Sequence, residues 1–258
     1  EINAADKSFA AATLASTPQP AIFTEGLPGK GVKLDGDAWL SCGSVGIFRK
    51  AEPFTIAMSL FIPNDFKEGV LFHKSIAERL YNLRGFHVYV RDNGTIEASM
   101  AHAAPSDAIM KVSRIKIPKG KWSHLALSYD GSSKADGLQL SLDGMKLDMI
   151  TEMDHLTKDI LFNRNGSKTE PGLQVGAWDR GLGLKNGIVD NITVYDRMLS
   201  PFEIAILAGK QNWKEISAKE VTAMSAAEKS ILEDYYFDAV HPASIAQRHS
   251  LISEGNRQ

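Results

Sequence analysis

The strongest fold signal in this chain is the stretch FHVYVRDNGTIEASM, residues 86–100. Apolar and polar residues alternate on both sides of Asn93-Gly94, and a period of two is the pattern of a strand buried on one face. Asn-Gly supplies the positive φ angles that a tight turn between antiparallel strands needs. The stretch therefore predicts a β-hairpin with His87, Tyr89 and Arg91 together on its polar face.

Strand signals of this kind recur from residue 21 to residue 195. A second hairpin is predicted around Asp143-Gly144, where apolar residues alternate in the preceding strand. Further strand patterns occupy 54–61, 122–129 and 187–195. Many short strands with Gly, Asn and Asp turns and almost no helical pattern between them predict an antiparallel sandwich or barrel.

The pattern becomes helical at Ser200. Ser200 is followed by a proline and then by Glu203, which together predict a capped helix start, and the run from Ser225 to Glu228 repeats the capping pattern. A third helix is predicted from Pro242. The apolar stripe of these helices needs a partner, either the sandwich or a domain outside this chain. We therefore divide the chain into a lead-in segment (1–20), a β domain (21–209) and a helical C-terminal segment (210–258).

Composition excludes several classes of protein. The 258 residues carry 29 Lys+Arg and 31 Asp+Glu, and this net charge of −2 provides no field for binding nucleic acid. No apolar stretch approaches the roughly 20 residues of a membrane span. The single cysteine, Cys42, is expected to be a small buried residue. Because the chain begins at Glu1, we expect a processed chain or an excised piece.

Several motifs then occur in an order that resembles a known family. They are GVKLDG (31–36), KWSHLALSYDG (121–131), LQLSLDG (138–144) and NGIVDNITVYDRMLSPFEI (186–204). In this order they resemble laminin-G-like, concanavalin A-like jelly-roll domains. The resemblance implies an all-β, two-sheet antiparallel jelly-roll sandwich over about residues 21–209, with a short helical appendage. It does not specify a ligand.

The C-terminal segment carries a second resemblance. LEDYYFD (232–238) and the polar helix after it resemble the segment that follows such a module in large bacterial proteins with a cytochrome c-like domain. The resemblance implies that this chain is a piece of a cytochrome c-associated multidomain protein. It also implies an extracytoplasmic location, in the periplasm or cell envelope, and neighbouring domains as partners.

A catalytic site is not predicted. Glycosidases on this type of fold carry carboxylates on alternate residues of one strand, since alternate residues share a face. Glu152 and Asp154 come nearest to that pattern, but the third acidic position is Thr157 and the flanking residues predict a loop. Glu97 lies on a predicted strand without a carboxylate two residues away. We therefore expect a protein that is not an enzyme, with glycoside hydrolysis as the least favoured alternative.

No cofactor is predicted. The seven histidines lack HxH and HExxH spacings. Laminin-G-like domains sometimes hold a structural Ca²⁺ with loop carboxylates, and Asp35, Asp37, Asp190 and Asn191 lie in or beside the matching motifs. A structural role for these residues, as acceptors of backbone hydrogen bonds, is the favoured interpretation. Calcium is the alternative that we leave open.

A ligand site is predicted on the concave face of the sandwich. Sugars are recognised by an aromatic platform with planar polar groups, and Trp178 with Arg180 fits that type. His87, Tyr89 and Arg91 would line the same sheet. The function expected is non-catalytic recognition of a glycan or a protein. One alternative is that Trp178 caps the core. The other is that the module orients neighbouring domains, which a filled concave face, or C-terminal helices packed across it, would favour.

Overall fold

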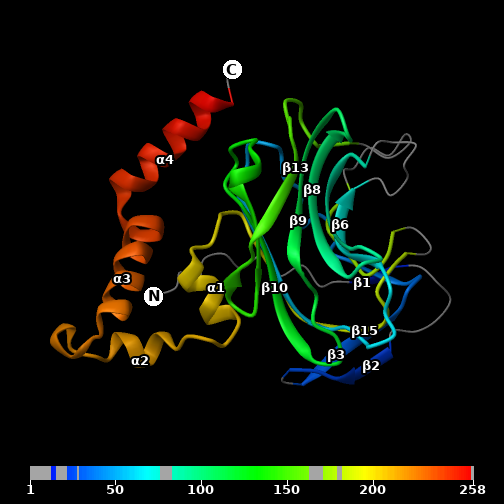
Figure 1. The fold of residues 1–258 in the computed structure, drawn as a ribbon, viewed down its shortest axis with the longest axis horizontal. Helices are drawn as coiled ribbons and strands as arrows, with labels where there is room; N and C mark the ends of the chain where they lie inside the picture. Colours follow the sequence, from blue (N-terminus) through cyan, green and yellow to red (C-terminus); the bar gives the residue numbers. More distant parts are fainter. Residues whose placement is uncertain are drawn as a thin grey trace.

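The structure is a computed structural model that describes residues 13–15, 22–27, 29–75, 83–162, 171–178 and 182–256. Two β-sheets are stacked face to face, and all the helices lie on one side of them (Figure 1). The strand pairs within both sheets are antiparallel. The predicted all-β jelly-roll sandwich with a helical C-terminal segment is confirmed.

In the described residues the first sheet has eight strands. Their order is β1 (Thr13–Ala15), β4 (Trp39–Ser41), β14 (Gln174–Val175), β6 (Gly69–Ser75), β7 (Gly85–Val90), β8 (Thr95–Ala103), β9 (Asp107–Lys116) and β13 (Met149–Asp154). Strand β1 comes from the lead-in segment and pairs with β4 at the edge of the sheet.

The second sheet has seven strands in the same described ranges. Their order is β12 (Met145–Lys146), β11 (Leu138–Leu142), β10 (Trp122–Tyr129), β5 (Phe54–Phe61), β15 (Lys185–Tyr195), β3 (Lys30–Asp35) and β2 (Ile22–Glu25). A short 3₁₀ turn, Ala135–Gly137, precedes β11.

Both predicted hairpins are present. Strands β7 and β8 pair from Gly85 opposite Ala101 to Val90 opposite Ile96, and Gly94 in the turn has a φ of +86°. Asp143 and Gly144 both have positive φ, +50° and +83°, as expected for the two central residues of a type I′ turn.

The space between the sheets is filled by one large hydrophobic cluster. At its centre Phe54 stacks on Phe48 and Phe86, with ring centroids 4.7 Å and 5.0 Å apart. Tyr129 packs against Phe54 and donates its hydroxyl to the Lys50 carbonyl, so the polar end of this buried ring is satisfied. Cys42 is buried in the same cluster, as predicted.

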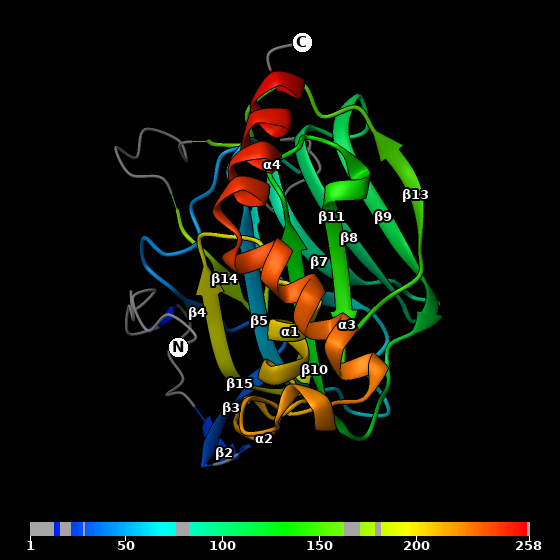
Figure 2. The ribbon, with the colours of Figure 1, turned by 90° about the vertical axis from the view of Figure 1, so that its left-hand side faces the viewer.

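The helical segment lies against the seven-stranded sheet. It consists of α1 (Pro201–Leu207), α2 (Trp213–Ser217), a 3₁₀ turn (Val221–Ala223), α3 (Ala226–Tyr235), a π-helical turn (Tyr236–Val240) and α4 (Pro242–Gly255). Helix α1 packs on β5 and β10, where Leu199 and Ile204 meet Ala57 and Ala126. Figure 2 shows α3 and α4 crossing in front of this sheet.

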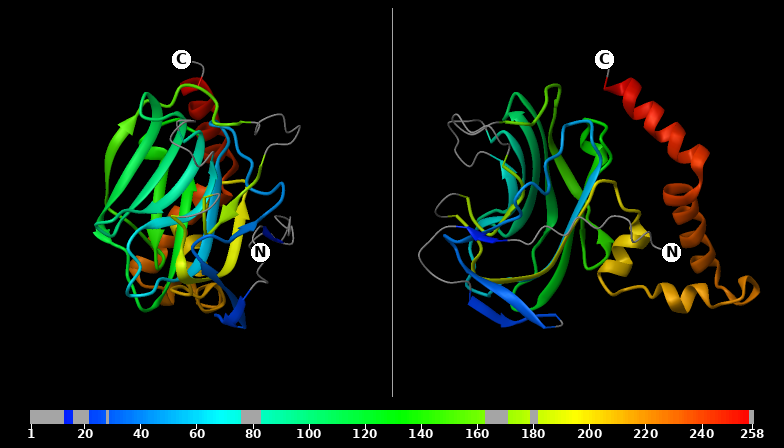
Figure 3. Two further views of the ribbon diagram at one scale, coloured as in Figure 1. Left: turned by 90° about the vertical axis from the view of Figure 1, so that its right-hand side faces the viewer. Right: turned by 180° about the vertical axis from the view of Figure 1, so that it is seen from behind.

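Helices α3 and α4, which we call the arm, touch the sandwich sparsely. No residue of α3 is buried, and neither is any described side chain of α4. The arm is attached through Tyr235, whose ring packs on Phe202 and Trp213, and through Asn256, which bonds Gly131 and Ser133. Seen from the opposite side, the eight-stranded sheet faces the viewer and the helices lie behind it (Figure 3, left).

Among the described residues, no helix combines the length and the hydropathy of a membrane-spanning segment.

Candidate functional site

The outer face of the eight-stranded sheet, which points away from the core, carries the candidate site. In β7 the side chains of Phe86, Val88 and Val90 belong to the core cluster. Because successive side chains of a strand point to opposite sides, His87 and Tyr89 lie on the outer face. The helices lie on the side of the other sheet, so they do not cover this face.

An aromatic cluster forms on this face around Trp178, which follows β14. Its ring stacks on Tyr89 with centroids 5.4 Å apart and planes 17° apart. The rings of His87 and His73 meet it edge-on at 5.2 Å and 5.9 Å. The indole nitrogen donates to the Ser75 hydroxyl at 3.1 Å. Trp178 therefore lies on the outer face and is held there by four residues of β6 and β7.

Charged residues continue the site toward β13. Glu97 of β8 accepts from His87 Nε2 and from Arg91 Nε, each at 2.8 Å. The Arg91 guanidinium also donates twice to Glu152, at 2.9 Å and 2.7 Å. At the other end of the site, the Tyr89 hydroxyl donates to Glu68 at 2.8 Å. The guanidinium of Arg91 is thus engaged by two carboxylates of the protein itself.

The prediction of a loop around Glu152 and Asp154 is wrong. Both residues belong to β13, an edge strand that pairs with β9 through a bulge between Thr151 and Met153. The strand is polar because its charged side chains find partners: Glu152 binds Arg91, and Asp154 accepts from the backbone of Ala135. Alternation in hydrophobicity is absent from such a strand, which is why the pattern suggested a loop.

The protonation states of the site follow from these contacts. Burial alone would raise the pKa of Glu97, but the hydrogen bonds and charges of His87 and Arg91 outweigh it and leave the pKa below its ordinary value. Burial, then the hydrogen bond to Glu68 and its charge, raise the pKa of Tyr89. At neutral pH Glu97 is a charged acceptor, and Tyr89 is a protonated donor.

Two polar atoms beneath the cluster lack partners in the described part of the chain. They are His87 Nδ1 and Ser99 Oγ, which belong to residues directly opposite each other on β7 and β8. Both side chains are about 1% exposed. Both atoms are closed to solvent, so a molecule on the outer face does not contact them directly.

The structure brings four of the five predicted site residues together. His87, Tyr89 and Trp178 come together in the aromatic cluster, and Arg91 adjoins them through Glu97. Arg180 lies outside the described residues. Sequence reasoning missed His73, Ser75 and Glu68. The first two could have been found by pairing β6 with β7, since His73 lies opposite His87, but Glu68 precedes the strand and carries no such signal.

The residues considered for calcium make backbone contacts. Asp35 accepts from the amides of Asp37 and Ala38, and these bonds lower its pKa. Asp190 accepts from Leu27, and Asn191 donates to the Leu27 carbonyl. Within the described ranges, no group of three or more His, Cys, Asp or Glu is placed to hold a metal ion.

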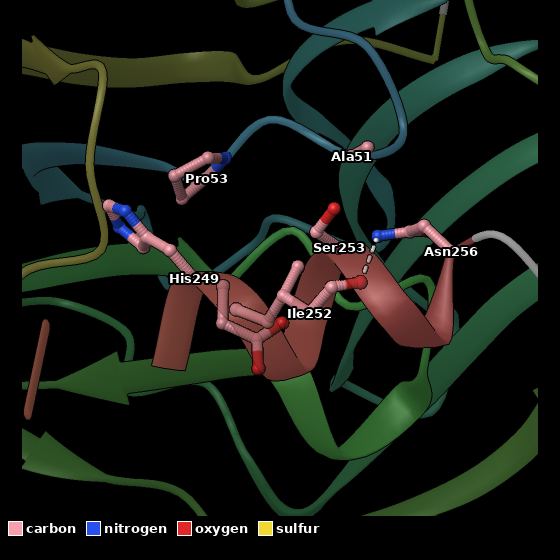
Figure 4. A pocket seen from close by; sticks show the side chains of 7 residues that line it. Ala51, Pro53, His249, Ile252, Ser253 and Asn256 are labelled. Carbon is pink, nitrogen blue, oxygen red and sulfur yellow. Dashed lines mark hydrogen bonds between the residues drawn. The ribbon is translucent and has the colours of Figure 1, made fainter. Parts of the chain in front are cut away.

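A cavity of about 450 Å³ lies on the far side of the molecule, between α4 and the sandwich (Figure 4). It is lined by Ala51, Pro53, Asp130, His249, Ile252, Ser253 and Asn256. The helix side chains come from a single face of α4 near its end, where Asn256 bonds Gly131.

The fold and this site can now be compared with known proteins. A laminin G family model, described as the concanavalin A-like lectin/glucanases superfamily, matches residues 34–205. The chain belongs to this superfamily. The match runs from β3 to α1 and ends before the arm.

Several solved structures share this fold at low sequence identity. Domain 4 of AbnA, an extracellular arabinanase from Geobacillus stearothermophilus solved with arabinotriose, is 16% identical at a TM-score of 0.52 and covers 76% of this chain and 87% of its own. The binding domain of paraclostridial mosquitocidal protein 1 is 15% identical at 0.54, covering 76% and 47%. The binding domain of botulinum neurotoxin serotype G is 13% identical at 0.53, covering 81% and 48%.

A search of the curated proteins found no match. The present chain spans about half the length of the two toxin chains. The cytochrome c-associated parent protein suggested by residues 232–238 is not supported by these comparisons.

Proposed function

We propose that this protein is a non-catalytic recognition module that binds a glycan on the outer face of its eight-stranded sheet. The observation that carries the proposal is the stacked pair of Trp178 and Tyr89, flanked by the carboxylates of Glu68 and Glu97. Aromatic rings accept the apolar faces of sugars, and carboxylates accept hydrogen bonds from their hydroxyl groups. Domain 4 of the arabinanase, solved with arabinotriose, supports a sugar as the ligand.

The charges of the site argue against catalysis. A glycosidase needs one carboxylic acid with a raised pKa, to protonate the leaving group, beside a second carboxylate. Glu97 has a lowered pKa, and it shares Arg91 with Glu152. The lowered pKa keeps Glu97 ionised at neutral pH, so Glu97 is not suited to donate a proton.

The setting of the module is part of the same proposal. The arabinanase that contains domain 4 is extracellular, and the toxin domains are binding domains. These neighbours support an extracytoplasmic location for the parent protein of this chain.

A role in assembly is the second candidate, and the arm favours it. Tyr236, Phe237 and Val240, between α3 and α4, are each nearly half exposed. Apolar side chains that gather on a surface mark contacts with other proteins. The arm would then hold a neighbouring domain while the sheet binds the glycan.

A binding screen with a matched tryptophan control tests the proposal. We expect Trp178→Ala to weaken retention on an immobilised glycan array by at least about fivefold, since a lost stacking platform costs about 1 kcal/mol or more. Trp122→Ala, which removes a half-buried tryptophan from the other sheet, should bind like the wild type. Equal retention of wild type and Trp178→Ala, with both proteins folded by circular dichroism, would refute the site.

A further inference from the structure

The charges around the aromatic cluster carry an inference about which saccharides bind. Among the described residues, Glu68, Asp92 and Glu97 act on the Tyr89 hydroxyl through their charges, and all three are carboxylates. A fourth, Glu152, lies on the far side of Arg91. Within the described ranges, the guanidinium that lies among these groups is that of Arg91. It is paired with Glu97 and Glu152, so its positive charge is already balanced.

Glu68 holds the exposed carboxylate that is hydrogen-bonded to the stacked pair. It is exposed, whereas the side chain of Glu97 is only 12% exposed. One of its oxygens accepts from Tyr89, which fixes the carboxylate at the edge of the stacked pair. A sugar ring lying on Trp178 and Tyr89 would meet an oxygen that accepts hydrogen bonds and donates none.

We propose that this site selects saccharides without acidic groups and rejects anionic ones, with Glu68 as the residue that determines this specificity. The inference rests on the proposed glycan-binding function. A carboxylate or sulfate on the ligand would lie near several like charges, whereas hydroxyl groups would donate to them. The repulsion acts between partly solvated groups, so it weakens as salt is added.

The test compares matched neutral and acidic sugars. Galacto-oligosaccharides are set against oligogalacturonates, and lactose against sialyllactose, at about 10 mM and 500 mM salt. At low salt we expect the neutral member of a pair to be retained at least about tenfold better, with the ratio shrinking at high salt. Equal or better retention of the acidic member at low salt would overturn the inference and leave the proposed function intact. A protein that binds no saccharide would overturn the proposed function itself.

A charge-neutralising variant tests the role of Glu68. The amide oxygen of Glu68→Gln still accepts from Tyr89, so the stacked pair keeps its anchor while one negative charge is lost. We expect the ratio of neutral to acidic retention to fall by about threefold or more. Glu254→Gln, which removes an exposed carboxylate from α4, should leave the ratio unchanged. An unchanged ratio in Glu68→Gln would remove Glu68 from the specificity argument.

Discussion

At the scale of single residues, Glu97 is the side chain that links the polar residues on the outer face of the sheet. It joins His87 of its neighbouring strand to Arg91, and through Arg91 it is connected to Glu152 of β13. Charge-assisted hydrogen bonds of this kind contribute more than neutral ones, and a partner left unpaired costs the desolvation of its charge.

The pH dependence of stability follows from the lowered pKa of Glu97. A carboxyl group with a lower pKa in the folded state stabilises the protein above its unfolded pKa, near 4.5, and loses this contribution as the pH falls further. We expect Glu97→Gln to lower the free energy of unfolding by about 1.5–3 kcal/mol at pH 7. The difference from wild type should shrink as the pH falls below about 4.5, as measured by urea unfolding.

Asp148→Asn is the control for this measurement. Asp148 pairs with Arg114, but both side chains are more than half exposed, and exposed pairs contribute about 0–1 kcal/mol. If Glu97→Gln showed the same small, pH-independent effect as Asp148→Asn, the network would have no special role.

Individual site residues could be predicted only where a strand pattern fixed the side of the sheet to which their side chains point. The alternation in residues 86–90 placed His87 and Tyr89 on one face, and the structure agrees. The contact of Tyr89 with Trp178 joins residues 89 positions apart, and no local pattern encodes it. The lack of a carboxylate two residues from Glu97 argues against an acid/base pair on its own strand, yet Arg91 connects Glu97 to Glu152 on another strand.

At the scale of elements, two similar capping boxes begin helices that differ in burial: α1 packs on the sheet, whereas α3 lies in the exposed arm. Ser200 and Ser225 each accept from the backbone of the third residue after them and complete a capping box. Glu203 of the first box is buried and binds Arg197, whereas the second box begins an arm without buried residues in α3.

We expect the same substitution to act globally at one start and locally at the other. Ser200→Ala should lower the stability of the whole β domain by about 1–2 kcal/mol, because the cap is buried between α1 and the sheet. Ser225→Ala should leave the global value within about 0.5 kcal/mol and instead speed amide hydrogen exchange in α3. Thermal melting and hydrogen exchange on both variants distinguish these outcomes, and equal global losses would contradict the expectation.

Elements were predictable where capping or turn residues marked their ends. Asn93-Gly94, Asp143-Gly144 and the two capping boxes placed hairpins and helices correctly. Strand β13 was missed because edge pairing and ion pairs, rather than burial on one face, stabilise it. Its hydrogen bonds to β9 depend on the tertiary structure and leave no periodic pattern in the sequence.

At the scale of the whole molecule, the sandwich does not need the arm for its core. The family match ends at residue 205, and the core cluster contains no residue of α3 or α4. We therefore expect a shortened chain of residues 1–224 to keep its β-sheet circular dichroism and to melt cooperatively within about 5 °C of the full chain. Loss of cooperative melting would contradict this, and it would also argue against the predicted division at residues 209 and 210.

The arm and the aromatic cluster lie on opposite sheets, so the two surfaces can be occupied independently. A saccharide on Trp178 and a protein on Phe237 would approach from opposite directions, with both β-sheets between them. The saccharide and the protein would not block each other, so both could bind at the same time. If both proposed attachments form, the chain would act as a tether, since each attachment would raise the local concentration of what the other one holds.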